Sequence, residues 1–288
     1  MIIKSAGLTD VGLKRKGNED AFHLEDSLGL YIVADGMGGH LAGEVASRIA
    51  LDIIIESCRR WIEQENPRED LFGAYDETLT AKGNCILSSI RLANRVIYEM
   101  AMHYEQYQGM GTTVVILLVT PDMVIAANVG DSRIYLVRNG RIERLSRDHT
   151  IVWEQVEQGI ISPEEAALSP LKHVLTRNLG SAEQVDPDIF EIDPGEDDLY
   201  ILCTDGLTDL VEDNEILEMT FTESEPQTLC QRFVESALER GGHDNTTVVC
   251  VSLSAPGRRV KEGMMKRAGF FFVDLLLWAQ KGIRNLVP

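Results

Sequence analysis

The chain has 288 residues, 44% of them hydrophobic and 25% charged, a composition typical of a globular protein with a large core. Its formal net charge of −19 argues against nucleic acid as a partner and favours cation binding, because a polyanion would be repelled over most of the surface. Five scattered cysteines without a CxxC pair indicate reduced, mostly buried thiols in a cytoplasmic protein and no zinc site. We expect no secretory signal, since residues 1–10 lack a basic region followed by an apolar one.

The first half of the chain predicts one buried strand and two helices. Residues 28–34 are almost entirely apolar, as in a strand covered on both faces, and lead through Asp35 into a glycine turn. Val45, Ile49 and Ile53 recur at the spacing of a helix that ends near residues 57–60. Polar residues 66–84 read mostly as loop, and a second amphipathic helix follows over about 86–103.

From residue 111 the apolar pattern changes to that of strands. Val- and Ile-rich segments at 112–119, 124–129, 134–137 and 142–145 are separated by turn residues, and Asn139-Gly140 is a strong hairpin signal. Short turns without intervening helices predict antiparallel pairing and exclude a Rossmann sheet.

Residues 147–190 interrupt these strands with short helices near 153–159 and from Ser162 onward. After this excursion the sequence predicts strands at 199–203 and 246–253, and helices near 214–219 and over 227–240.

The C-terminal tail differs in composition from the rest of the chain. From Arg258 onward it carries seven basic and two acidic residues, so we place a boundary near Pro256 and predict a domain over 1–254 and a basic, partly apolar tail over 255–288. The apolar run 270–279 is too short to span a bilayer. The tail has two readings, a basic amphipathic helix that contacts an acidic membrane or a partner, or a segment that folds back on the acidic domain.

Carboxylates follow the predicted strand ends in a repeated format. In four of them the acid is followed directly by glycine or a small polar residue: Asp35-Gly36, Gly130-Asp131-Ser132, Asp205-Gly206 and Asp244-Asn245. Glu19-Asp20 precedes the first central strand. A single Asp-Gly is more often a turn than a ligand, but strand ends of one sheet lie side by side. Oxygen ligands without Cys or His at ligand spacing suit Mg²⁺ or Mn²⁺.

The order of these motifs resembles the bacterial members of the metal-dependent Ser/Thr protein phosphatases, the PP2C or PPM family, over about residues 5–254. Seven motifs carry the resemblance: Arg15 with Asn18-Glu19-Asp20, Asp35-Gly36-Met37-Gly38-Gly39-His40, Gly111-Thr112-Thr113, Asn128-Val129-Gly130-Asp131-Ser132-Arg133, Ser146-Arg147-Asp148-His149, Cys203-Thr204-Asp205-Gly206-Leu207 and Asp244-Asn245-Thr246-Thr247.

The resemblance implies an α+β fold, an α-β-β-α sandwich in which helices flank two antiparallel sheets, with residues 147–190 as the flap subdomain near the metal cleft. It implies two Mn²⁺ or Mg²⁺ ions sharing a bridging water, with Asp35 between them. Asp205 and Asp244 would complete the first ion's protein ligands, and Glu19 and the Gly36 carbonyl the second's. Asp20 would stand behind these ligands, and Asp131 with Asp205 would form a weaker third site; a turn is the other reading of Asp131.

Two further residues receive catalytic roles from the resemblance. Arg15 would hold the substrate phosphate, for which a forked guanidinium is well shaped. Animal relatives carry a histidine where this chain has Met37, so His40 or a metal-bound water would protonate the leaving oxygen. The other histidines, His173 among them, are interpreted as structural.

The resemblance thus implies a phosphatase for phosphoserine and phosphothreonine in proteins, the counterpart of a Ser/Thr kinase. Two alternatives are a pseudophosphatase that binds without catalysis and a phosphatase dedicated to one anti-sigma-factor pathway. The complete set of acidic residues argues against the first, and the intact Arg15 argues weakly against the second.

Overall fold

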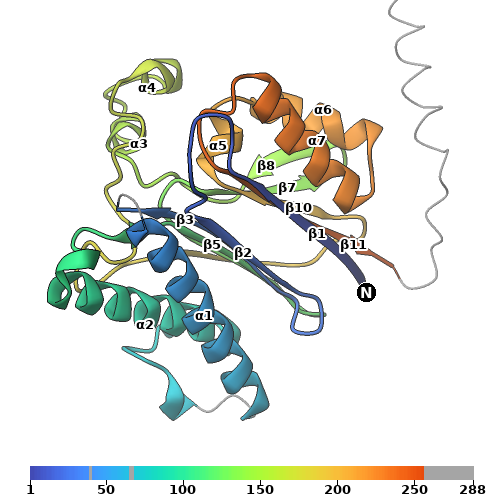
Figure 1. The fold of residues 1–288 in the computed structure, drawn as a ribbon. Helices are drawn as coiled ribbons and strands as arrows, with labels where there is room; N and C mark the ends of the chain where they lie inside the picture. The colour runs from blue at the N-terminus through green and yellow to red at the C-terminus, as the bar shows by residue number, and fades with distance from the viewer. Residues whose placement is uncertain (39–40, 65–67, 256–288) are drawn as a thin grey trace, which may run out of the picture.

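The computed structural model describes residues 1–38, 41–64 and 68–255, which form two stacked antiparallel sheets between two helical layers (Figure 1). The first sheet has the order β1-β11-β10-β7-β8, with bounds Ile2–Asp10, Thr246–Ser254, Leu199–Cys203, Arg133–Arg138 and Arg141–Arg144. The second has the order β2-β3-β5-β6-β9, with β4 beside the end of β3; the bounds of β2–β6 and β9 are Asp20–Glu25, Leu30–Met37, Gly111–Thr112, Val114–Val119, Val124–Val129 and Asp188–Ile192. The predicted α+β sandwich is confirmed.

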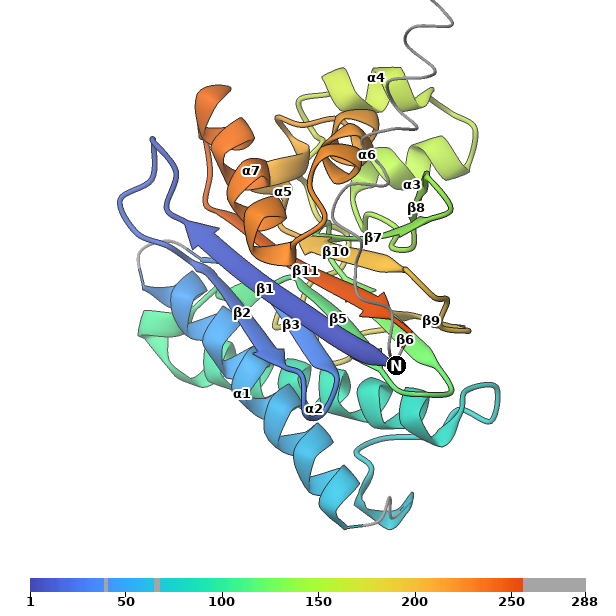
Figure 2. The same ribbon diagram turned by 90° about the vertical axis from the view of Figure 1, so that its right-hand side faces the viewer.

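Helices cover the outer face of each sheet, as the two views show (Figures 1 and 2). Helices α1 (Ala42–Glu63) and α2 (Ala81–His103) pack on the second sheet, and α5 (Asp205–Thr208), α6 (Asp213–Thr222) and α7 (Pro226–Glu239) pack on the first. Short 3₁₀ turns stand at 68–70 and 105–107. A third apolar cluster, which includes Tyr31, Val115 and Leu202, lies between the two sheets.

Local signals in the sequence account for several of these boundaries. Helix α2 begins five residues earlier than its apolar stripe, because Thr80 caps it by accepting a hydrogen bond from Gly83 N. Asn139 and Gly140 both have positive φ, 53° and 72°, as the predicted hairpin requires. The predicted helix start at Ser162 is a complete capping box with Glu165.

The flap segment, residues 147–190, carries α3 (Ile151–Glu157) and α4 (Pro163–Leu168), which stand apart from the sheets at one end of the sandwich (Figure 1). The chain returns from this excursion into β9, an edge strand that pairs with β6 and was not predicted. Strands β1 and β2 were not predicted either.

All five cysteines are free and buried, as predicted. No helix among the described residues is long and apolar enough to cross a membrane. The predictions for the tail beyond residue 255, and for His40, fall outside the described residues.

Candidate metal and phosphate site

The predicted carboxylates meet at one end of the sandwich because their strands end there. Asp35 lies opposite Asp20 in the β2–β3 register. The turn after β10, which holds Asp205, packs against the start of β11, since a Cβ on Gly206 would lie 2.0 Å from Asn245 O. Asp244 directly precedes Asn245, so both sheets deliver acidic residues to the same place.

Backbone contacts fix Glu19 and Asp35 before any ligand is considered. Glu19 N donates to Asn245 Oδ1 (2.8 Å), and Glu19 O accepts from Gly36 N (3.2 Å) and Ser47 Oγ (2.7 Å). Asp35 O accepts from Thr113 N (2.8 Å). These bonds join β3 to the start of α1 and to β11. They hold the backbone of Glu19 and Asp35 in place, and so fix where the two side chains begin.

Glycines let the chain close around these residues. A Cβ on Gly36 would lie 2.1 Å from Gly43 O and 2.7 Å from Glu19 O. A Cβ on Gly43 would lie 2.7 Å from Glu19 Oε1. Side chains at these two positions would therefore push α1 away from β3 or displace the Glu19 carboxylate.

Burial and mutual repulsion disfavour ionisation of the central acids. Burial, with the charges of Asp205 and Asp244, raises the pKa of Asp20 to about 7, although hydroxyls of Thr247 and Thr204 donate to its Oδ2 at 2.7 and 3.0 Å. Burial raises the pKa of Asp131 to about 8, and with the charges of Asp20 and Asp205 it raises the pKa of Asp35 well above its ordinary value.

Two buried carboxylate oxygens in this cluster, Asp20 Oδ1 and Asp205 Oδ1, have no hydrogen-bond partner. A buried acceptor without a donor costs free energy, and several acids packed together cost more. A bound divalent cation would accept the unpaired carboxylate oxygens as ligands and offset the repulsion among the acids. The residues present therefore fit the Mn²⁺ or Mg²⁺ implied by the sequence.

Arg15 is placed at this cluster, but its partner is a predicted metal ligand. Its Nη2 donates to Asp244 Oδ2 at 2.6 Å, while about half of the Arg15 side chain (52%) stays exposed. That hydrogen bond raises the pKa of Arg15. The guanidinium therefore stands at the rim of the site, beside the acids and open to solvent.

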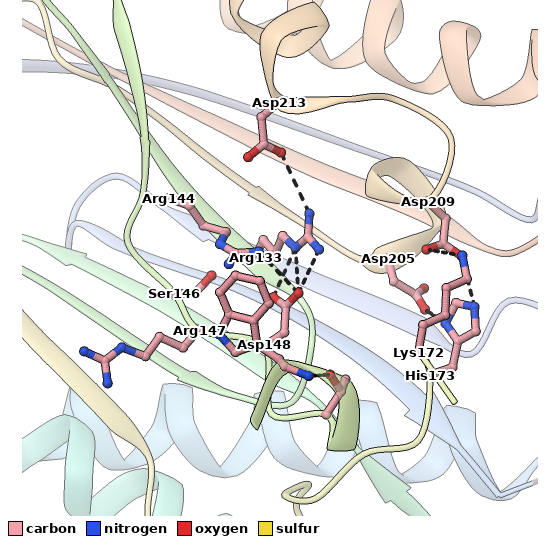
Figure 3. A network of polar contacts seen from close by, with 12 residues as sticks. Arg133, Arg144, Ser146, Arg147, Asp148, Lys172, His173, Asp205, Asp209 and Asp213 are labelled. Carbon is pink, nitrogen blue, oxygen red and sulfur yellow. Dashed lines mark hydrogen bonds and ion pairs between the residues drawn. The ribbon is translucent and has the colours of Figure 1, made fainter. Parts of the chain in front are cut away.

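The structure brings in one residue that sequence reasoning interpreted as structural. His173, in the flap, has Nδ1 3.3 Å from Asp205 Oδ2 and Nε2 3.2 Å from Asp209 Oδ2, as Figure 3 shows. The contact with Asp205 raises the pKa of His173. No spacing signal pointed to this histidine, because it lies in the least regular part of the chain.

A buried ion-pair network joins the flap to the strand beside Asp131 (Figure 3). Arg133 donates to both oxygens of Asp148, at 3.1 Å from Nε to Oδ1 and 2.7 Å from Nη2 to Oδ2. Asp148 also contacts Arg144 at 3.3 Å, and the Arg144 guanidinium lies over the Trp153 ring at 4.2 Å. Two bonds between Gly130 and His149 add to this connection: His149 N donates to Gly130 O (2.9 Å), and Gly130 N donates to the ring nitrogen Nδ1 of His149 (3.1 Å).

We expect Asp148→Ala to lower the free energy of unfolding by about 3–5 kcal/mol, because the largely buried Arg133 loses its hydrogen-bonded carboxylate and keeps only Asp213, 3.8 Å away. Urea unfolding of the two proteins measures the difference. Arg147→Ala is the matched control: its side chain is 60% exposed, and we expect a change within about 0.5 kcal/mol. Equal stability of the Asp148 variant and the wild type would contradict the expected dependence on this network.

An α-β-β-α sandwich whose strand ends gather buried and half-buried acids beside an arginine defines a divalent-cation site suited to phosphate ester chemistry. Comparisons with known proteins agree. The sequence profile described as protein phosphatase 2C (PP2C) matches residues 7–246, so the chain belongs to the PP2C family.

Known relatives match over most of their length. The protein phosphatase PhpP of Streptococcus pneumoniae is 33% identical over 86% of this chain and 96% of its own. The crystal structure of the serine/threonine phosphatase PstP/Ppp of Mycobacterium tuberculosis matches with a TM-score of 0.76 and 33% identity, over 88% and 100% of the two chains. A structure of the PstP catalytic domain in complex with two manganese ions matches with a TM-score of 0.73 and 32% identity, over 88% and 99%.

The function predicted from the sequence is thereby confirmed at the level of the family. The protein is a serine/threonine protein phosphatase that uses Mn²⁺ or Mg²⁺ and acts on phosphoproteins. The comparisons give no support to the pseudophosphatase alternative.

Proposed function

We propose that the carboxylates at the strand ends hold the catalytic cations in the arrangement predicted from the sequence. Asp35 would contribute to holding two cations, Asp205 and Asp244 would complete the protein ligands of the first, Glu19 and the Gly36 carbonyl would serve the second, and Asp20 would support these ligands from behind. Asp131 with Asp205 holds a third. The observation that carries this proposal is the buried, mutually repelling acid cluster with partnerless oxygens on Asp20 and Asp205.

When bound, the cations activate water and neutralise charge on the transferring phosphoryl group. The chain's own residues do the rest. The acids position the cations through strands that backbone bonds fix, and Arg15 exchanges Asp244 for the substrate phosphate at the rim. The open side of the Arg15 guanidinium suits it for this exchange, since a phosphate dianion accepts two parallel N–H bonds.

We expect Arg15→Ala to raise KM for a phosphopeptide about 10–100-fold. This increase corresponds to the binding free energy lost with hydrogen bonds from a charged group. Arg15→Lys should recover part of this loss, because an ammonium keeps the charge but not the fork. Initial rates on one phosphothreonine peptide measure both. Unchanged KM in Arg15→Ala would remove Arg15 from the substrate site.

Turnover of phosphoserine and phosphothreonine peptides with and without EDTA tests the metal assignment, together with Asp205→Asn. Turnover should stop in EDTA, return with Mn²⁺ or Mg²⁺, and fail to return in the variant. Activity that survives both chelator and substitution would overturn the assignment.

We further propose that residues 1–254 act as one catalytic domain in the cytoplasm, with the flap at its cleft, and that the physiological substrates are products of a cognate Ser/Thr kinase. Five free thiols support the reducing compartment. Phosphoproteomics of a deletion strain tests the kinase relation, because the accumulating phosphosites should match those of one kinase.

Contact of the 255–288 tail with an acidic membrane or a partner is tested by flotation of the full chain beside a variant ending at Ala255.

A further inference from the structure

The flap reaches the acid cluster through two neighbouring residues, Lys172 and His173 (Figure 3). Lys172 Nζ lies 3.1 Å from Asp209 Oδ1, and the two ring nitrogens of His173 face Asp205 and Asp209. Short turns fix this segment, with Lys172 N bonded to Ser169 O and Val174 N to Leu171 O. The backbone after it is tied to the start of α3 by Ile151 N and Val174 O at 3.0 Å.

The positions of three potential ligand atoms fit one cation. Asp131, His173 and Asp205 each offer one atom, and these atoms all lie within 4.8 Å of one another. Ligands that bind one ion at about 2.0–2.3 Å are separated by distances of this order. The buried Asp205 Oδ1 without a partner is an independent sign that this carboxylate lacks a ligand.

Asp209 provides a carboxylate that can orient the His173 ring. Its Oδ2 faces His173 Nε2 at 3.2 Å, and one turn of α5 places it beside Asp205, through the bond from Asp209 N to Asp205 O (2.8 Å). A histidine that binds a metal commonly donates its other ring N–H to a carboxylate, which fixes the tautomer. With Nε2 donating to Asp209, Nδ1 is the nitrogen left for a cation.

We propose that His173 Nδ1 is a protein ligand of the cation held by Asp131 and Asp205, with Asp209 and Lys172 as positioning residues. This proposal rests on the assignment of Asp131 and Asp205 above. An imidazole ligand favours a first-row transition-metal ion over Mg²⁺, which prefers oxygen. The ion at this site would therefore tie the flap to the catalytic centre. This site would also discriminate between metals, whereas the other two proposed cation sites have only oxygen ligands.

Pulsed electron paramagnetic resonance of the full chain loaded with Mn²⁺ tests the ligand directly. We expect a ¹⁴N coupling from a bound imidazole in the wild type, its loss in His173→Ala, and its retention in His103→Ala, a control at an exposed histidine on α2. Persistence of the coupling in His173→Ala, or its absence from the wild type, would overturn the proposal.

Equilibrium Mn²⁺ binding gives the second readout. His173→Ala should weaken the weakest site about 10–100-fold and leave the other two unchanged, and Asp209→Asn should weaken the same site about tenfold while keeping the ¹⁴N coupling. Mg²⁺ should displace Mn²⁺ from this site more readily in His173→Ala than in the wild type. Unchanged affinity in His173→Ala would overturn the His173 ligand alone, whereas absence of Mn²⁺ binding and turnover in the wild type would overturn the metal assignment of the whole cluster.

Discussion

Replacing Asp35 by asparagine is expected to abolish phosphatase activity and, at the same time, to stabilise the metal-free protein. Asp35 lies opposite Asp20 and within the field of Asp205 and Asp131, at the centre of the acid cluster. The amide keeps the shape of the side chain but removes the charge that would hold two cations. We expect kcat to fall by at least about 10³-fold, or about 4 kcal/mol of transition-state stabilisation.

The stability effect has the opposite sign. In the metal-free protein Asp35 carries either a charge among like charges or a proton that the unfolded chain would release at neutral pH, and both cost free energy. An asparagine carries neither cost, so we expect a gain of about 2 kcal/mol and a Tm higher by about 4–8 °C in EDTA.

Calorimetry in EDTA and phosphopeptide turnover in Mn²⁺ measure the two effects of Asp35→Asn. Asp52→Asn, at an exposed position of α1, is the matched control and should change neither. A variant with turnover within tenfold of the wild type, or with an unchanged Tm in EDTA, would contradict the central position assigned to Asp35.

The sequence predicted the parts of this molecule that local pattern determines. A strand such as β3 is apolar on both faces, so its end could be located, and a carboxylate at that end could be assigned to the edge of the sheet. The same reasoning placed Asp205 and Asp131. Because strand ends of one sheet lie side by side, the pattern also suggested a site for a hard divalent cation. The family resemblance then supplied the role of each residue, which no pattern gives.

Two of the three unpredicted strands, β1 and β9, depend on partners far away in the chain, whereas β2 pairs with its neighbour β3. Strand β1 pairs residue by residue with β11, from Ile2 opposite Ser254 to Asp10 opposite Thr246, and its own sequence has only weak alternation. Strand β9 is partly exposed along its length and follows an irregular segment. Tertiary pairing, rather than propensity, makes them strands.

Two basic side chains at the acid cluster, His173 and Arg15, show the same limit at the level of single contacts. His173 has no helical or strand period that connects it with Asp205, since the flap brings them together only after it folds back. The bond between Arg15 and Asp244 joins residues 229 positions apart. In the metal-free protein the contact of Arg15 with Asp244 partly offsets the negative charge of the cluster.

Gly36→Ala should be among the most damaging single-methyl changes available in this chain. The added Cβ would lie 2.1 Å from Gly43 O and 2.7 Å from Glu19 O, both backbone atoms that cannot rotate away. The start of α1 would have to move off the end of β3. We expect a loss of at least about 3 kcal/mol in unfolding free energy, with Tm lower by about 6–12 °C.

The same movement would reach the chemistry, because Gly36 follows Asp35 and its N–H donates to Glu19 O. A shift of about 1 Å in positioning groups can cost about 10²-fold in rate. Turnover of Gly36→Ala should therefore fall by at least that factor even at temperatures where the variant is still folded. Gly17→Ala is the control, since a Cβ there meets nothing within 4 Å and should leave both quantities unchanged.

Gly43→Ala separates packing from ligand position. Its Cβ would meet the Glu19 side chain, at 2.7 Å from Oε1, rather than a backbone atom, and a side chain can yield. We expect a smaller loss of stability than in Gly36→Ala but weaker binding of Mn²⁺ at the site proposed for Glu19, measured by equilibrium binding. Wild-type stability in Gly36→Ala, or wild-type Mn²⁺ affinity in Gly43→Ala, would show that the start of α1 does not constrain the metal ligands as these distances require.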